Sequence, residues 1–174
     1  MNVEQITSII LPENELEKRL LSDQDLIQGL TYGKPRRSHP EGQVLYHVRD
    51  VLGNIDRFQF LDQRVALRLI ALVHDSFKYK VDKSKSKIGE NHHATIARRF
   101  AEKYIQDAGV LDVIQFHDEA YNAWRKSDEE RVRNLISRLG INLILFLQFY
   151  KCDNCVKGKT QEHFEWFQKL VRAE

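Results

Sequence analysis

Apolar residues recur at spacings of three and four along most of the chain, and this period limits the fold more than any other feature. The clearest stripe comprises Val44, Val48, Val51, Leu52 and Ile55. Stripes of the same period occupy residues 67–74, 96–104, 110–117, 132–150 and 164–171, and residues 16–30 add one or two polar helices. This is the helical period, and convincing period-two alternation is absent. The spacing predicts an all-α helical bundle of about six to eight helices, with residues 132–150 in one long helix.

The length and charge of the chain narrow its class. A chain of 174 residues suits one domain, here residues 1–174, with its terminal helices packed on the central ones. Its 27 basic and 25 acidic residues nearly cancel, so a nucleic-acid partner is not expected. The first residues lack the pattern of a secretory signal, and the apolar stretch 141–150 is too short to span a bilayer. We therefore expect a cytoplasmic protein with no membrane partner.

Two cysteines form the motif CDNC at residues 152–155. A redox pair or half of a zinc site is conceivable for such spacing, but a second CxxC motif is absent and no strand precedes this one. Two reduced cysteines on a helix are the favoured interpretation.

Four histidines and one aspartate lie on the apolar faces of different predicted helices. Each is separated by three, four or seven residues from apolar members of its own stripe; the five are His47, His74, His93, His117 and Asp153. One inward-facing histidine is most often an ordinary core residue, as His163 illustrates with its apolar neighbours. Several together each need a buried polar partner, and one divalent ion satisfies several at once. Imidazole and carboxylate ligands favour manganese, iron, nickel, cobalt or zinc.

These residues, in this order, resemble the HD-domain superfamily of metal-dependent phosphohydrolases. The resemblance covers residues 33–157. The segment HPEGQVLYHV (39–48) is similar to the one that leads to the first metal histidine of many members. HDSFK (74–78) matches the family's His-Asp-x-x-Lys motif, and HHATIA (92–97) resembles its third motif, in which His93 rather than His92 is the matching histidine.

The resemblance implies an HD-type fold with one or two metal ions. A first ion is expected on His47, His74, Asp75 and Asp153. In two-metal members Asp75 bridges to a second ion, which His93 and His117 hold here. Asp118, which follows His117, either ligates or orients His117 as a hydrogen-bond acceptor.

Cationic side chains near these residues suit a phosphorylated substrate. Lys78 fits a phosphate-binding and catalytic role by its position and by the motif, although a lysine near a helix C-terminus is also favoured by the helix dipole. Arg36 and Arg37 precede the HPEG segment, and a guanidinium group suits phosphate oxygens. Ordinary loop charges are an alternative, but a substrate-binding role toward phosphate is favoured for one of the two. The lysine-rich stretch that begins at Lys78 is either a solvated surface or a basic lid over an anionic substrate.

Hydrolysis of a nucleotide or similar small phosphate ester, by metal-activated water with Asp75 and Lys78 in the catalytic roles, is the favoured function. The enzyme is expected to be a phosphomonoesterase or a phosphodiesterase. A di-iron oxidative enzyme, known among a minority of HD-like proteins, is the first alternative. A non-catalytic metal- or nucleotide-binding regulatory module is the second, and the complete set of ligands argues against it.

Overall fold

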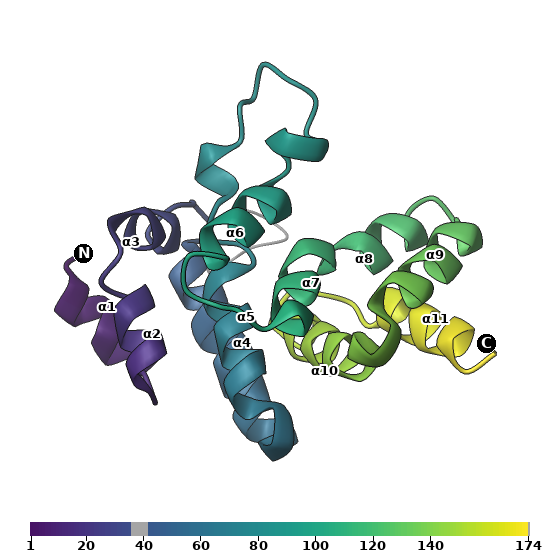
Figure 1. Ribbon diagram of the computed structural model, residues 1–174, viewed down its shortest axis with the longest axis horizontal. Helices are drawn as coiled ribbons and strands as arrows, with labels where there is room; N and C mark the ends of the chain where they lie inside the picture. Colours follow the sequence, from purple (N-terminus) through teal and green to yellow (C-terminus); the bar gives the residue numbers. More distant parts are fainter. Residues whose placement is uncertain (36–41, 174) are drawn as a thin grey trace.

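The computed structural model describes residues 1–35 and 42–173, and within these ranges every regular element is helical (Figure 1). The predicted all-α class is confirmed. The bounds of the helices are α1 Val3–Ile10, α2 Glu15–Leu20, α3 Gln24–Leu30, α4 Val44–Phe58, α5 Arg64–Val73, α6 His93–Ala101, α7 Ala108–Phe116, α8 Glu119–Trp124, α9 Glu129–Leu139, α10 Leu143–Asn154 and α11 Glu162–Val171. Short 3₁₀ turns occupy Leu61–Gln63, Lys78–Lys80, Gly89–Asn91 and Gly140–Asn142.

Helices α4, α5, α7 and α10 form the centre of the molecule. Helix α5 packs against α4, α7 and α10, while α6 lies along α7. In Figure 1 the N-terminal helices α1–α3 cover one side of this centre, and α8, α9 and α11 form the other end. The buried apolar side chains make one continuous core that extends from Ile6 in α1 to Phe167 in α11.

The N-terminal helices are fixed to α5 by a buried ion pair. Arg68 in α5 is 3% exposed and donates two hydrogen bonds of 2.9 Å to the carboxylate of Glu17, which is fully buried. Arg68 also donates to the carbonyl oxygen of Leu11 at 3.0 Å, at the end of α1. A bidentate pair of this kind holds α1 and α2 in register with the helix that leads to His74.

Helix α3 contacts the segment that follows α5. A Cβ atom on Gly29 would lie 1.7 Å from the backbone oxygen of Ser76, so only glycine permits this close approach. Ser76 is fully buried, and its hydroxyl donates to the carbonyl oxygen of Leu72 at 2.7 Å. The backbone next to Asp75 is therefore held between α3 and the end of α5.

The single long helix predicted for residues 132–150 is wrong. Gly140 has φ 49° and ψ −121°, which ends α9, and a short 3₁₀ turn leads into α10. The apolar period continues through the break because both helices contribute to the same core, so periodicity alone could not reveal it. The sequence prediction also missed α1 and placed Tyr104 in the helix that ends at Ala101.

The stretch Glu129–Asn154 is long and apolar enough to cross a membrane by length and composition, with a mean hydropathy of 1.3 over its best window. Length and composition are weak evidence, since core helices pass the same test. This stretch is interrupted at Gly140, and Phe146 and Phe149 are fully buried in the core.

Candidate metal centre

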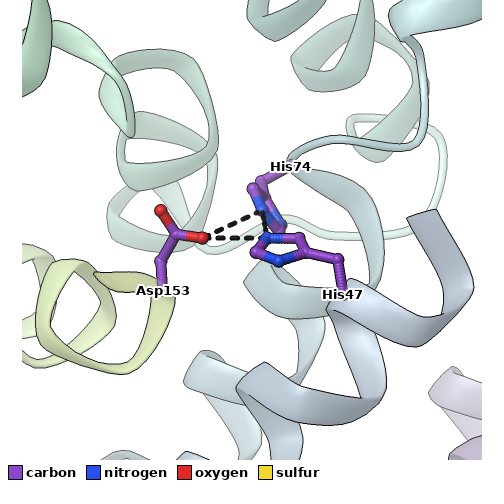
Figure 2. Close-up of side chains that lie close together, drawn as sticks. All are labelled: His47, His74 and Asp153. Atoms are coloured by element: carbon purple, nitrogen blue, oxygen red, sulfur yellow. Dashed lines mark hydrogen bonds and ion pairs between the residues drawn. The ribbon is translucent and has the colours of Figure 1, made fainter. Parts of the chain in front are cut away.

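The first cluster of ligand atoms consists of His47 on α4, His74 at the end of α5 and Asp153 on α10. The three side chains point toward one another (Figure 2). The Nε2 atom of His47 lies 3.3 Å from Nε2 of His74 and 2.9 Å from Oδ1 of Asp153, and His74 Nε2 lies 3.8 Å from the same oxygen. All three residues are buried. Three helices thus bring together three atoms that could ligate a metal ion.

A second cluster consists of Asp75, His93 and His117. The Nε2 atoms of His93 and His117 lie 3.2 Å apart, and each is 3.5 Å from Oδ1 of Asp75. His93 is the first residue of α6, and His117 caps the end of α7. The sequence predicted both histidines as ligand candidates, and the fold brings them to one carboxylate oxygen.

The carboxylate of Asp75 faces both clusters. Its Oδ1 atom belongs to the second cluster, while its Oδ2 atom lies 3.7 Å from His74 Nε2 and 3.9 Å from His47 Nε2. A carboxylate can bridge two ions by presenting one oxygen to each of them. Asp75 has this arrangement.

The two His-Asp dipeptides of the chain have the same local structure. His74 and His117 each lie at the C-terminal end of a helix in helical conformation. Nδ1 of His74 donates to the carbonyl oxygen of Ala71 at 3.0 Å, and Nδ1 of His117 donates to that of Ile114 at 2.9 Å. A proton on Nδ1 leaves Nε2 of a neutral imidazole as a lone pair directed into the cluster. The negative ends of both helix dipoles also favour a cation there.

The spacing of the ligand atoms is that of side chains that could share a metal ion. With metal–ligand bonds of about 2.1 Å, neighbouring ligand atoms are about 3.0 Å apart in an octahedron and about 3.4 Å apart in a tetrahedron. The second cluster has distances of 3.2, 3.5 and 3.5 Å, and the first ranges from 2.9 to 3.9 Å when Asp75 is included. These buried His/Asp clusters could therefore hold metal ions.

The surroundings favour the neutral forms of His74 and His93 and the ionised forms of Asp75 and Asp153. Burial lowers the pKa of His74 to about 3 and also lowers the pKa of His93. Burial opposes ionisation of Asp75, but Lys78 and the nearby histidines outweigh it and hold the pKa of Asp75 well below its ordinary value. His117 differs: burial opposes its protonation, but its hydrogen bond to Asp75 and the nearby charges of Asp118 and Asp75 together outweigh burial and raise its pKa. Neutral imidazoles beside carboxylates are the ligand forms that a metal needs.

Asp118 lies beside the second cluster. Its Oδ2 atom is 3.4 Å from Nε2 of His92 and 3.9 Å from Nε2 of His93, and these three residues form a further group that could hold an ion. Burial opposes ionisation of Asp118, but the hydrogen bond from His92 and the nearby histidines lower its pKa. The suggestion that Asp118 orients His117 finds no support, because Nδ1 of His117 is already bonded to Ile114.

A cavity of about 430 Å³ opens next to the clusters. Asp75, His93, His117 and Asp153 contribute to its lining, together with Lys78 and Lys159. An aromatic group from α8, α10 and α11 lines another part of it, and its members are Tyr121, Trp124, Tyr150 and His163.

The aromatic group is an ordered network. His163 is 4% exposed, and its Nδ1 atom lies 2.8 Å from the hydroxyl of Tyr150. The ring centroids of Tyr121 and Trp124 lie 5.1 and 5.5 Å from that of His163. The sequence analysis identified His163 only as a core histidine and missed the other rings, because no spacing rule connects α8 to α11.

Two lysines contact the aspartates of the clusters, one in each cluster. The ammonium of Lys78 forms an ion pair with Oδ2 of Asp75, and its side chain is 30% exposed. Lys159 contacts both carboxylate oxygens of Asp153 at 2.9 Å. Lys78 was predicted from its motif, whereas Lys159 lies in a loop where the sequence offered only a lysine six residues after Asp153.

Of the other predicted cationic residues, the structure describes the lysines but not the two arginines. Arg36 and Arg37 lie outside the described residues. A second cavity, of about 570 Å³, is lined by Lys34 and Lys83 as well as by His47, Asp75 and Lys78. In the lysine-rich stretch, Lys80 pairs with Asp25 and Lys85 with Asp82, so these two are engaged on the surface. Lys83 alone among the described lysines of residues 79–87 lines either cavity.

Comparison with known proteins adds no relative: no family model, no curated sequence and no solved structure matches the chain. The assignment of the clusters therefore depends on the geometry of their own residues.

Proposed function

We propose that this protein is a metal-dependent phosphohydrolase that cleaves a small, nucleotide-like phosphate ester with a water activated at the two clusters. The observation that carries the proposal is the position of Asp75, whose two oxygens each face a separate group of histidine Nε2 atoms at 3.5–3.9 Å. Ions held there would lower the pKa of water toward neutrality and neutralise the oxygens of a phosphoryl group. Manganese, iron, nickel, cobalt and zinc all suit these nitrogen and oxygen ligands.

The residues of the chain have separate tasks in this proposal. His74 and His117 are pre-oriented by the Ala71 and Ile114 carbonyl oxygens, so little reorganisation accompanies ligand binding. Asp75 sets the relative position of the two clusters. Lys78 lines the cavity beside Asp75, where an ammonium group stabilises charge that develops on phosphoryl oxygens.

The aromatic lining supports the nucleotide-like part of the proposal. Tyr121 and Trp124 present rings to the same cavity that the clusters border, and Tyr121 is 40% exposed. Aromatic side chains stack on planar bases with an energy of about 1–3 kcal/mol per base. A sugar phosphate without a base lacks this contact and is expected to bind more weakly.

The test begins with metal analysis of protein purified without chelator, followed by a panel of phosphate esters with added Mn²⁺. Phosphate release from AMP but much less from ribose 5-phosphate is the expected result, with both activities lost in Asp75→Ala. Trp124→Leu tests the contact with the base. It should reduce phosphate release from AMP more than phosphate release from ribose 5-phosphate.

Failure takes recognisable forms. Metal-loaded protein that cleaves no ester in a broad panel of phosphomonoesters and phosphodiesters contradicts the proposal. Oxygen uptake by the iron-loaded protein would then identify an oxidative enzyme. Metal and AMP binding without turnover of either kind would identify a regulatory module.

A further inference from the structure

Lys159 has an unusual set of partners. Its ammonium nitrogen lies 2.9 Å from each carboxylate oxygen of Asp153 and 3.0 Å from the backbone oxygen of the same residue. An ammonium group has three N–H donors, and all three are directed to one aspartate. Lys159 thus completes its hydrogen bonding on a residue of the first cluster.

One of these carboxylate oxygens, Oδ1 of Asp153, also faces the histidines of the first cluster. Oδ1 of Asp153 is the atom that lies 2.9 Å from His47 Nε2 and 3.8 Å from His74 Nε2, so it is the oxygen that this aspartate offers to an ion in the first cluster. An ion bound to that oxygen would repel the ammonium beside it and weaken its bond. Binding of a divalent cation and full engagement of Lys159 therefore compete.

Lys159 lies where an ammonium group released from Asp153 could enter the cavity. Its side chain is 22% exposed and lines the same cavity as Asp75, Lys78 and the histidines of the second cluster. It lies in the loop between α10 and α11, directly after Gly158, whose φ of 89° is in the region that favours glycine. Of the described residues that line this cavity, only Lys78 and Lys159 carry a permanent positive charge.

We infer that Lys159 is an exchangeable counter-ion: it neutralises Asp153 in the metal-free protein, and a divalent ion in the first cluster frees it to bind an oxyanion, such as the phosphoryl group of a substrate, in the cavity. The inference rests on the proposed metal centre and adds to it a second anion-binding residue. It also makes anion binding depend on metal binding, because the same ammonium cannot fully serve Asp153 and the anion.

Calorimetric titrations of Mn²⁺ and then inorganic phosphate into the full chain test this directly. In Lys159→Met the competitor of the metal is absent, so the affinity for Mn²⁺ should rise by about three- to tenfold. The affinity of the Mn²⁺-loaded variant for phosphate should fall by about tenfold or more, as expected when a charged hydrogen bond is lost. Lys159→Arg should retain phosphate binding. Lys157→Met is the matched control, because Lys157 is exposed two residues away and should change neither affinity.

A second measurement uses the unaltered chain and so does not depend on the folding of a variant. Acetylation of lysines, mapped by mass spectrometry, should modify Lys159 faster after Mn²⁺ is added, and phosphate should then protect it. Lys157 should react at one rate throughout.

Four results would overturn the inference. Weaker Mn²⁺ binding in Lys159→Met would mean that the lysine supports Asp153 as a ligand rather than competing with the metal. Unchanged phosphate affinity, or acetylation of Lys159 that ignores Mn²⁺, would remove its role toward anions and leave the proposed hydrolysis intact. A wild-type protein that takes up no metal would refute this inference and the proposed function together.

Discussion

Asp75 is the residue whose replacement discriminates most sharply between one shared metal centre and separate clusters. Its Oδ1 atom lies 3.5 Å from the histidines of the second cluster, and its Oδ2 atom faces those of the first. The Nε2 atom of His117, in contrast, is grouped only with the ligand atoms of Asp75 and His93, although its ring also packs edge-on against that of His74. Asp75→Ala should therefore remove both ions, whereas His117→Ala should remove only one.

The expected magnitudes follow from mass action. At a free Mn²⁺ concentration about one hundred times the dissociation constant, each bound ion stabilises the native state by about 2.7 kcal/mol. For a chain of 174 residues, 1 kcal/mol raises Tm by about 2–4 °C. Two ions of similar affinity should thus raise Tm by about 11–22 °C in the wild type, and His117→Ala should show about half of that rise. Asp75→Ala should show almost none.

Differential scanning calorimetry with and without Mn²⁺, together with metal counting after desalting, measures these shifts. Asp50→Ala is a suitable control, since this residue lies on α4 near His47 but pairs with Arg49 at the surface. A shift in Asp75→Ala as large as that in His117→Ala would show that the carboxylate is not shared. Loss of the entire shift in His117→Ala would show that the first cluster cannot hold an ion alone.

Three further substitutions test the surroundings of the clusters. Gly29→Ala should lower the free energy of unfolding by about 1–3 kcal/mol and weaken metal binding, because the new methyl group meets the Ser76 backbone. Gly53→Ala is the control: a Cβ atom there would have no neighbour within 4 Å, so this variant should be neutral or stabilising in the same denaturation assay. Lys78→Met should still bind the metal but should lower kcat/KM by an amount that corresponds to a loss of about 2–4 kcal/mol of transition-state stabilisation. An unchanged kcat/KM would exclude the phosphate-binding role. Burial lowers the pKa of His163, so the unfolded chain takes up more protons as pH falls below the ordinary histidine range and stability is lost on acidification. His163→Gln should lose less stability than the wild type between pH 7 and 5.5, and equal losses in the two denaturation series would contradict this.

The four histidines and Asp153 could be predicted from the sequence because each lies on a helix or at its end and shares a face with apolar residues, whereas Asp75 was predicted from its motif. His47, for example, follows Val44 and precedes Val51 at helical spacings, and all three are buried. The helical period fixes which side chains face inward, so it predicted that the histidines face the core, while their grouping around metal ions was only what the resemblance implied. It could not assign them to two clusters, because that depends on how α6 and α7 pack beside α5.

The remainder of the cavity could not be predicted for physical reasons. Lys159 reaches Asp153 through a loop, and loops carry no period that fixes the direction of a side chain. Tyr121 and Trp124 meet His163 only because α8 packs against α11, a contact between distant segments. The break at Gly140 was hidden because a glycine inside an apolar period is compatible with a continuous helix as well as with a turn.

The ion pairs of Lys78 with Asp75 and of Lys159 with Asp153 also affect the stability of the metal-free protein. Buried carboxylates without a partner would be costly, yet Asp75 is paired with Lys78 and Asp153 with Lys159. Arg68 on α5 and Glu17 on α2 neutralise each other in the same core. Charge is therefore balanced within the chain itself, and the core from Ile6 to Phe167 is continuous. A protein built in this way should stay folded when metal is removed, so ion binding can change the charge of the cavity without assembling the fold.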